Sequence, residues 1–99
     1  MTFIQTIEFT TTRVTQFQAL MDEWLASTGG RRTPQRATLL ADQDRPNTYL
    51  QIVEFPSYEE AMQNSALPET SQFADRASRL VDTGPVYRNL DVQRVDDLS

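Results

Sequence analysis

The sequence predicts one α+β domain, a four-stranded antiparallel sheet with helices on one face, in the order βαββαβ. Three observations lead to this class. Segments near both ends and in the middle alternate apolar and polar residues, the period of a strand. Between them lie segments with apolar residues three or four positions apart, the period of a helix. At 99 residues the chain has the length of one small domain, so residues 1–99 are expected to form a single unit.

The first half of the chain begins with a strand and a helix. Residues alternate from Phe3 to Phe9, which predicts a strand. The run Thr10-Thr11-Thr12 offers an N-cap for a helix whose apolar positions recur from Val14 to Leu25. Gly29-Gly30 is expected to end that helix.

A hairpin is predicted next, after a loop over residues 31–35. The segments 37–41 and 48–55 have strand character, and the turn-prone residues 42–47 separate them. They should pair in antiparallel fashion.

The second half is predicted to hold an interrupted helix and a last strand. Ser57 and Glu60 have the spacing of a capping box, and Pro68 should break the helix near residues 65–67 and restart it. Gly84-Pro85 should end the second piece, and residues 86–93 alternate as a strand. Three residues of the second piece are expected to point inward: Phe73, Ala77 and Leu80.

Both faces of this sheet would carry large apolar residues, although helices can cover only one. Ile4 and Phe3 fall on opposite faces, as do Leu39 and Leu40. A face of that kind is too apolar to remain in water, and a second copy of the chain is the simplest cover. We therefore predict a homodimer.

The composition removes several kinds of chemistry. The chain has no histidine and no cysteine, and it also lacks lysine, so a Ser-His-Asp triad and the usual zinc or haem ligands are excluded. A net charge of −5 opposes binding to nucleic acid or to an anionic membrane. No segment has the length and apolarity of a membrane span or a signal peptide. We expect a cytoplasmic protein with no metal and no cofactor.

The segment from Glu54 to Pro68, in which a strand ending in an acidic-aromatic pair leads into a capped, alanine-rich turn, carries a family resemblance. With the βαββαβ order, the chain resembles a dimeric α/β barrel of ferredoxin-like topology, and it is most similar to the antibiotic biosynthesis monooxygenase family. The resemblance spans nearly the whole chain. It implies a cofactor-independent oxygenase that holds an aromatic compound in a pocket between sheet and helices.

The resemblance also implies site residues. Asn64 matches a helical asparagine of the family and Arg88 an arginine near the last strand, so both are expected to be catalytic. Pro68 and Ala74 stand where the family has a tryptophan and a tyrosine. The haem-degrading branch needs a helical histidine, which this chain does not contain.

Each candidate residue also has a structural interpretation. Arg88 could anchor a ligand or form an ion pair with Glu8 or Glu54, because a guanidinium on an apolar strand face needs an anion. The amide of Asn64 could face a ligand, although we favour a cap on backbone groups freed before Pro68.

Four aromatic residues could line a binding pocket, although such residues more often fill a core: Trp24, Phe17, Tyr49 and Phe73. Two functions are compatible with these observations. The first is a cofactor-independent monooxygenase or isomerase acting on a small aromatic or enolisable molecule. The second is a non-catalytic homodimer of the same fold that binds a small apolar ligand or acts as an accessory subunit.

Overall fold

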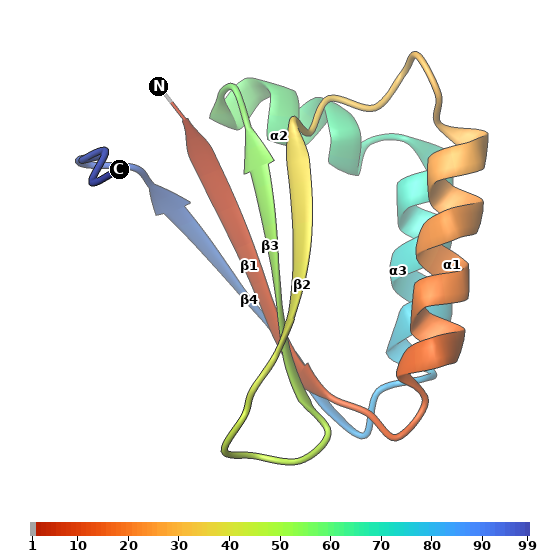
Figure 1. Cartoon of the computed structure of the whole chain (residues 1–99). Helices are drawn as coiled ribbons and strands as arrows, with labels where there is room; N and C mark the ends of the chain where they lie inside the picture. Colours follow the sequence, from red (N-terminus) through yellow and green to blue (C-terminus); the bar gives the residue numbers. More distant parts are fainter. Residues whose placement is uncertain (1) are drawn as a thin grey trace.

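A computed structural model describes residues 2–99 and shows a four-stranded antiparallel sheet covered on one face by three helices (Figure 1). The strand order across the sheet is β2-β3-β1-β4. The predicted fold class is confirmed. The elements, in chain order, are β1 (Phe3–Thr10), α1 (Val14–Ser27), β2 (Arg36–Ala41), β3 (Thr48–Phe55), α2 (Tyr58–Ser65), α3 (Pro68–Ser78) and β4 (Thr83–Asp91).

The second helical region follows the local signals of the sequence closely. Ser57 is the N-cap of α2, and its hydroxyl accepts a hydrogen bond from the amide of Glu60 at 3.2 Å. Pro68 stands in the first turn of α3, where its missing N–H removes no helical hydrogen bond. The break between the two helices therefore lies where the sequence predicts it.

The start of α1 differs from the prediction, because no threonine side chain caps it. The N-cap residue is Arg13, and the hydroxyl of Thr11 accepts from the Arg13 amide at 3.0 Å while donating to the carbonyl of Leu80 at 2.6 Å. Thr11 is 1 % exposed. It therefore ties the β1–α1 turn to the end of α3 instead of capping the helix.

The start of β4 also differs, because Gly84 and Pro85 lie inside the strand. Gly84 has φ +89°, and a Cβ there would come within 2.7 Å of the carbonyl oxygen of Glu8. The register between β1 and β4 shifts between Glu8 and Thr10. The glycine therefore permits a close backbone approach at an irregular point of the sheet.

The register assigns each strand residue to one of two faces. Ile7 pairs with Gln51 of β3 and Tyr87 of β4, on the face that the helices cover. Thr6 pairs with Ile52 and Arg88, on the opposite face. We call these the inner and the outer face.

The core occupies the inner face in two clusters at opposite ends of the sheet. One cluster is built from four buried residues, namely Phe9, Phe17, Leu20 and Ala77. The other is built from Phe3, Phe55 and Ala61. Because β1 and β3 contribute to both ends, the stretch of inner face between the clusters is framed by packed side chains.

Candidate functional site

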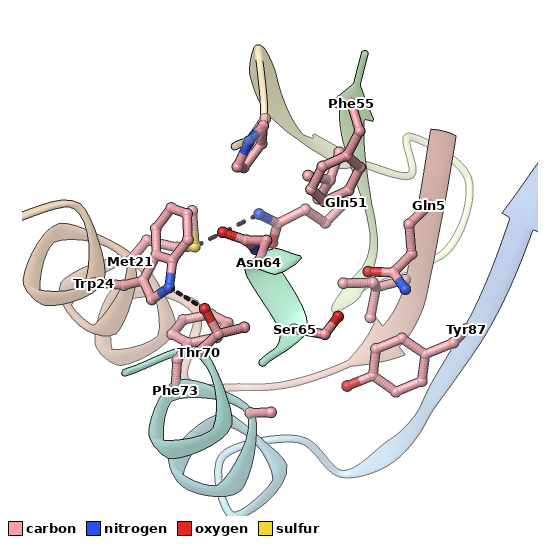
Figure 2. Close-up of a pocket in the computed structure, with 15 residues that line it drawn as sticks. Gln5, Met21, Trp24, Gln51, Phe55, Asn64, Ser65, Thr70, Phe73 and Tyr87 are labelled. Carbon is pink, nitrogen blue, oxygen red and sulfur yellow. Dashed lines mark hydrogen bonds between the residues drawn. The ribbon is translucent and has the colours of Figure 1, made fainter. Parts of the chain in front are cut away.

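A cavity of about 220 Å³ lies on the inner face, between the sheet and all three helices (Figure 2). The two core clusters border it, one through Ile7, Met21 and Phe73 and the other through Val53 and Phe55. Fifteen residues line it. The other ten are Gln5, Trp24, Pro34, Ala37, Gln51, Asn64, Ser65, Thr70, Ala74 and Tyr87.

Two amide side chains in this lining have buried oxygens without hydrogen-bond partners. Gln51 of β3 is 4 % exposed and Asn64 of α2 is 7 % exposed. Neither Oε1 of Gln51 nor Oδ1 of Asn64 accepts a hydrogen bond from the described residues. A buried polar atom of this kind costs stability unless something pairs with it. The two oxygens are therefore buried, unpaired acceptors in a lining that is mostly apolar.

Three further polar side chains of the lining, those of Trp24, Gln5 and Ser65, each donate a hydrogen bond within the protein. The indole Nε1 of Trp24 donates to Oγ1 of Thr70 at 3.0 Å, which joins α1 to α3 (Figure 2). Gln5 Nε2 donates to Oδ1 of Asn89 at 3.3 Å, and the hydroxyl of Ser65 donates to the carbonyl of Ala61 at 3.1 Å. These bonds shape the cavity wall.

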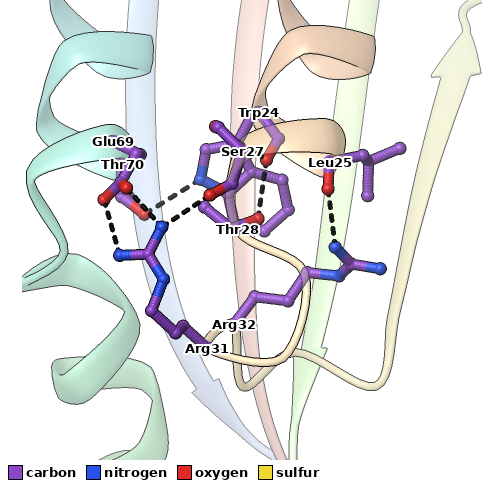
Figure 3. A network of polar contacts seen from close by, with 8 residues as sticks. All are labelled: Trp24, Leu25, Ser27, Thr28, Arg31, Arg32, Glu69 and Thr70. Atoms are coloured by element: carbon purple, nitrogen blue, oxygen red, sulfur yellow. Dashed lines mark hydrogen bonds and ion pairs between the residues drawn. The ribbon is translucent and has the colours of Figure 1, made fainter.

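A polar network next to Trp24 holds the two longer helices together (Figure 3). The guanidinium of Arg31 forms an ion pair with Glu69 and donates to the carbonyl of Ser27. Hydrogen bonding to Arg31 lowers the pKa of Glu69 below its usual range. Thr28, with 0 % of its surface exposed, donates to the carbonyl of Trp24 at 2.6 Å. The tryptophan is thereby fixed at the edge of the cavity.

Only Tyr87, among the fifteen described residues that line the cavity, has a side chain that titrates. Tyr87 is 51 % exposed, and the partial burial of its phenol raises the pKa above the usual value. The phenol is therefore protonated at neutral pH and can donate a hydrogen bond, but it cannot accept a proton. The cavity is electrically neutral, with amide acceptors on β3 and α2 and a phenol on β4.

Three of the residues predicted for a site lie around this cavity: Asn64, Trp24 and Phe73. The cap interpretation of Asn64 is wrong, because within residues 2–99 its side chain bonds no freed backbone group. Instead its backbone carbonyl accepts from the amide of Leu67 at 3.2 Å.

Phe17 and Tyr49 do not line the cavity, which corrects the prediction that four aromatic residues line one pocket. Both rings pack on Phe9, with centroid separations of 4.8 Å and 5.8 Å. They fill the core cluster, as the structural interpretation has it.

The prediction that Arg88 shares the pocket with Asn64 is wrong for a single chain. Arg88 pairs with Thr6 in the β1–β4 ladder and so lies on the outer face, across the sheet from the cavity. Its guanidinium lies 3.6 Å from a carboxylate oxygen of Glu8. The alternation of β4 explains the error, since Tyr87 takes the inward position and Arg88 the outward one.

Sequence reasoning missed Gln51 and Tyr87 as cavity residues. Gln51 stands between Tyr49 and Val53 on the inward positions of β3, and a polar residue within such a series is a signal that could have been used. Tyr87 could not be assigned to a face until the register of β4 was known.

The outer face of the sheet carries several large apolar residues and lies on the side away from the helices (Figure 1). Leu40, Val86 and Leu90 have 42 to 47 % of their surface exposed. Ile4, Leu50 and Ile52 lie on the same face. Two ion pairs lie on this face at 3.6 Å each: Arg88–Glu8, with Arg88 between Val86 and Leu90 on β4, and Arg36–Glu54, which joins β2 to β3.

The fold is that of solved antibiotic biosynthesis monooxygenase-type proteins. The chain is similar to SnoaB, a cofactor-independent oxygenase from Streptomyces nogalater, with 17 % identity over 95 % of each chain and a TM-score of 0.80. A conserved protein from Methanosarcina mazei matches with 10 % identity over 93 % of each chain and a TM-score of 0.80.

A candidate antibiotic biosynthesis monooxygenase from Caulobacter crescentus matches with 9 % identity, over 94 % of this chain and 91 % of that one, and a TM-score of 0.79. No protein-family model matches the sequence, and no curated protein matches it. At these identities the likeness establishes the fold. No helix in residues 2–99 combines the length and the apolarity needed to cross a membrane.

Proposed function

We propose that the inner-face cavity binds a small aromatic or enolisable molecule, and that the protein is a cofactor-independent, monooxygenase-like enzyme of the cytoplasm. The observation that carries this proposal is the buried amide of Asn64, whose oxygen has no partner, in the lining of a mostly apolar cavity. Ligand sites commonly combine apolar walls with a few placed polar groups. The similarity in fold to a cofactor-independent oxygenase supports the same reading.

The lining restricts the chemistry. Because no carboxylate lines the cavity and Tyr87 is protonated at neutral pH, the substrate must lose its proton to water through its own acidity. An amide N–H of Asn64 or the phenol of Tyr87 would then stabilise the enolate oxygen by hydrogen bonding. In the oxygenase reaction a CH₂ group and dioxygen become a carbonyl group and water.

We also propose that the outer face is covered by a second copy of the chain. Val86, Leu90 and their neighbours would pack against the same residues of the other subunit, in an isologous contact. Arg88 and Glu8 would then lie within the subunit interface. In this assembly Arg88 acts on the interface and not on the substrate.

Oxygen uptake tests the enzymatic proposal. The protein would be mixed with a panel of single-ring phenols and cyclic 1,3-diketones, and dioxygen consumption followed with an electrode. Asn64→Ala should lower a measured turnover by about 100-fold, the size of effect found when an oxyanion donor is removed. Gln63→Ala, an exposed neighbour on α2, should leave it unchanged.

The second candidate function is a non-catalytic binding or accessory homodimer, which the lack of any base in the cavity favours. The rate of deuterium exchange into the enolisable position of a diketone, compared with and without the protein, separates the two. An exchange rate or oxygen uptake that rises above the protein-free value, and loses that excess in Asn64→Ala, supports the enzyme. Binding of the panel compounds without either reaction supports the second candidate.

A further inference from the structure

Gln51, like Asn64, is a polar residue of the cavity that is buried without a hydrogen-bond partner for its side-chain oxygen. The remaining Gln51 contact is weak, since Nε2 lies 3.5 Å from the sulfur of Met21. Gln5 shows the contrast, because its amide lines the same cavity and is paired with Asn89. An apolar side chain at position 51 would also be compatible with the fold, because Tyr49 and Val53 occupy the neighbouring positions on the same face of β3. An unpaired glutamine there is costly in the empty protein and useful when a ligand supplies a donor.

The unpaired oxygens of Gln51 and Asn64 come from different elements, β3 and α2, and face one cavity (Figure 2). Both are acceptors, and neither is satisfied by the other. The group that completes them must therefore bring hydrogen-bond donors. Hydroxyl or amino groups fit this requirement, whereas a methyl group or an ether oxygen does not.

The size and charge of the cavity limit the ligand further. A cavity of about 150 Å³ is known to hold benzene, so about 220 Å³ suits a single substituted ring. No charged side chain belongs to the lining. A ligand that carries a charge would find no ion-pair partner in this lining, which favours ligands that are neutral when they bind.

We infer that Gln51 is a specificity-determining residue, which together with Asn64 selects neutral single-ring ligands that carry hydrogen-bond donors. The inference rests on the proposed use of the cavity as a binding site and names what that site accepts. Gln51 would both bind ligands that carry donors and disfavour ligands that lack them. A ligand without donors leaves two buried oxygens unpaired, and such a defect discriminates more strongly than a small change in apolar area.

Trp24 provides the measurement, because it is the only tryptophan of the sequence and it lines the cavity. Its fluorescence, excited at the red edge of the indole band, would be titrated with catechol and with ortho-xylene. These probes have nearly the same shape, and two hydroxyl groups of one replace two methyl groups of the other. Wild-type protein should bind catechol at least tenfold more tightly, and Gln51→Leu should reduce that preference by about tenfold.

Gln63→Leu is the matched control, because it makes the same chemical change at an exposed position of α2. It should keep the wild-type preference. The comparison of the two probes on wild-type protein needs no variant, so it remains informative if Gln51→Leu fails to fold.

Three results would overturn the inference. Equal binding of both probes to wild-type protein would show a cavity that binds rings without selecting donors, which leaves the proposed function standing. A preference unchanged in Gln51→Leu would remove Gln51 as its source. If neither probe binds, both the inference and the proposed use of the cavity as a binding site for small rings are wrong.

Discussion

The two faces of the sheet differ in whether they carry charged side chains. On the inner face, the described lining of the cavity holds two unpaired amides and one phenol and no charged group. On the outer face, Arg88 and Arg36 each form an ion pair among apolar side chains. The same strands build both faces, since neighbours such as Tyr87 and Arg88 point in opposite directions.

This difference indicates what each face is suited to meet. A neutral cavity with directional acceptors suits a small uncharged molecule, because hydrogen bonds select it without the cost of burying charge. An apolar surface that also carries separate ion pairs suits a protein surface, because apolar contact gives affinity and charges set orientation. The predictions that follow test this assignment, beginning with the largest effect.

Removal of a large side chain should be far more costly on the inner face than on the outer one. Phe9 is 2 % exposed and contacts the rings of Phe17 and Tyr49. Phe9→Ala should lower the free energy of unfolding by about 3–5 kcal/mol, measured by urea denaturation of dilute protein. Val86→Ala, at a position 45 % exposed, should cost less than about 1.5 kcal/mol. Equal losses would contradict the difference between the faces.

A charge in the middle of the outer face should separate the proposed dimer. Ile52→Glu would place a carboxylate on the central strand β3, and twofold symmetry would place two of them in one contact. The association constant should fall by about 100-fold or more, measured by sedimentation equilibrium. Leu98→Glu, in the exposed tail, should not change it. A monomeric wild-type protein at micromolar concentration would contradict the dimer itself.

The sequence was sufficient for the fold because each element carries its own local signal. Alternation marks the strands, Ser57 and Glu60 mark the start of α2, and Pro68 marks the break before α3. The N-cap of α1 was predicted wrongly because a threonine hydroxyl can bond locally or across the fold. Thr11 bonds Leu80, a residue 69 positions away, and no local pattern announces such a partner.

The candidate site was only partly predictable, because it depends on which face each residue takes. The family resemblance makes Asn64 a candidate, although the sequence alone favours a cap, and helical periodicity places Trp24 on an apolar face without deciding between pocket and core. Arg88 and Tyr87 are neighbours, and the register of β4 alone decides which of them meets the cavity. A shift of one residue would exchange them. The sequence contains both possibilities, and tertiary packing selects one.

Replacement of Asn64 by an apolar residue of similar size should stabilise the empty protein. The unpaired Oδ1 of Asn64 has no compensation in the absence of a ligand, so Asn64→Leu should raise the stability by about 1 kcal/mol, or about 4–8 °C in melting temperature. Thr28→Val is the control of opposite sign. Its hydroxyl is buried and bonded to the carbonyl of Trp24, so its loss should destabilise the protein by about 1 kcal/mol. Destabilisation by Asn64→Leu would show a structural role for that amide.

The smallest effect concerns the charges that hold α1 and α3 together above the inner face. Arg31 lowers the pKa of Glu69 in the folded protein, so their ion pair stabilises the fold above the unfolded pKa of a glutamate, about 4.3. That contribution is lost as the pH falls through the lowered pKa of Glu69. At neutral pH the melting temperature of the wild-type protein should therefore be higher than that of the Glu69→Gln variant, by less than the shift expected for Asn64→Leu. The difference in melting temperature should vanish in acid.

Thermal unfolding of both proteins across that pH range measures the effect, with Asp22→Asn as an exposed carboxylate control on α1. The pair is partly exposed to solvent, which screens it and keeps its contribution small. A difference between wild type and Glu69→Gln that persists in acid would show that Glu69 acts through packing instead of charge. The two helices would then be joined by packing and by the hydrogen bond from Trp24 to Thr70, without a contribution from the charge of Glu69.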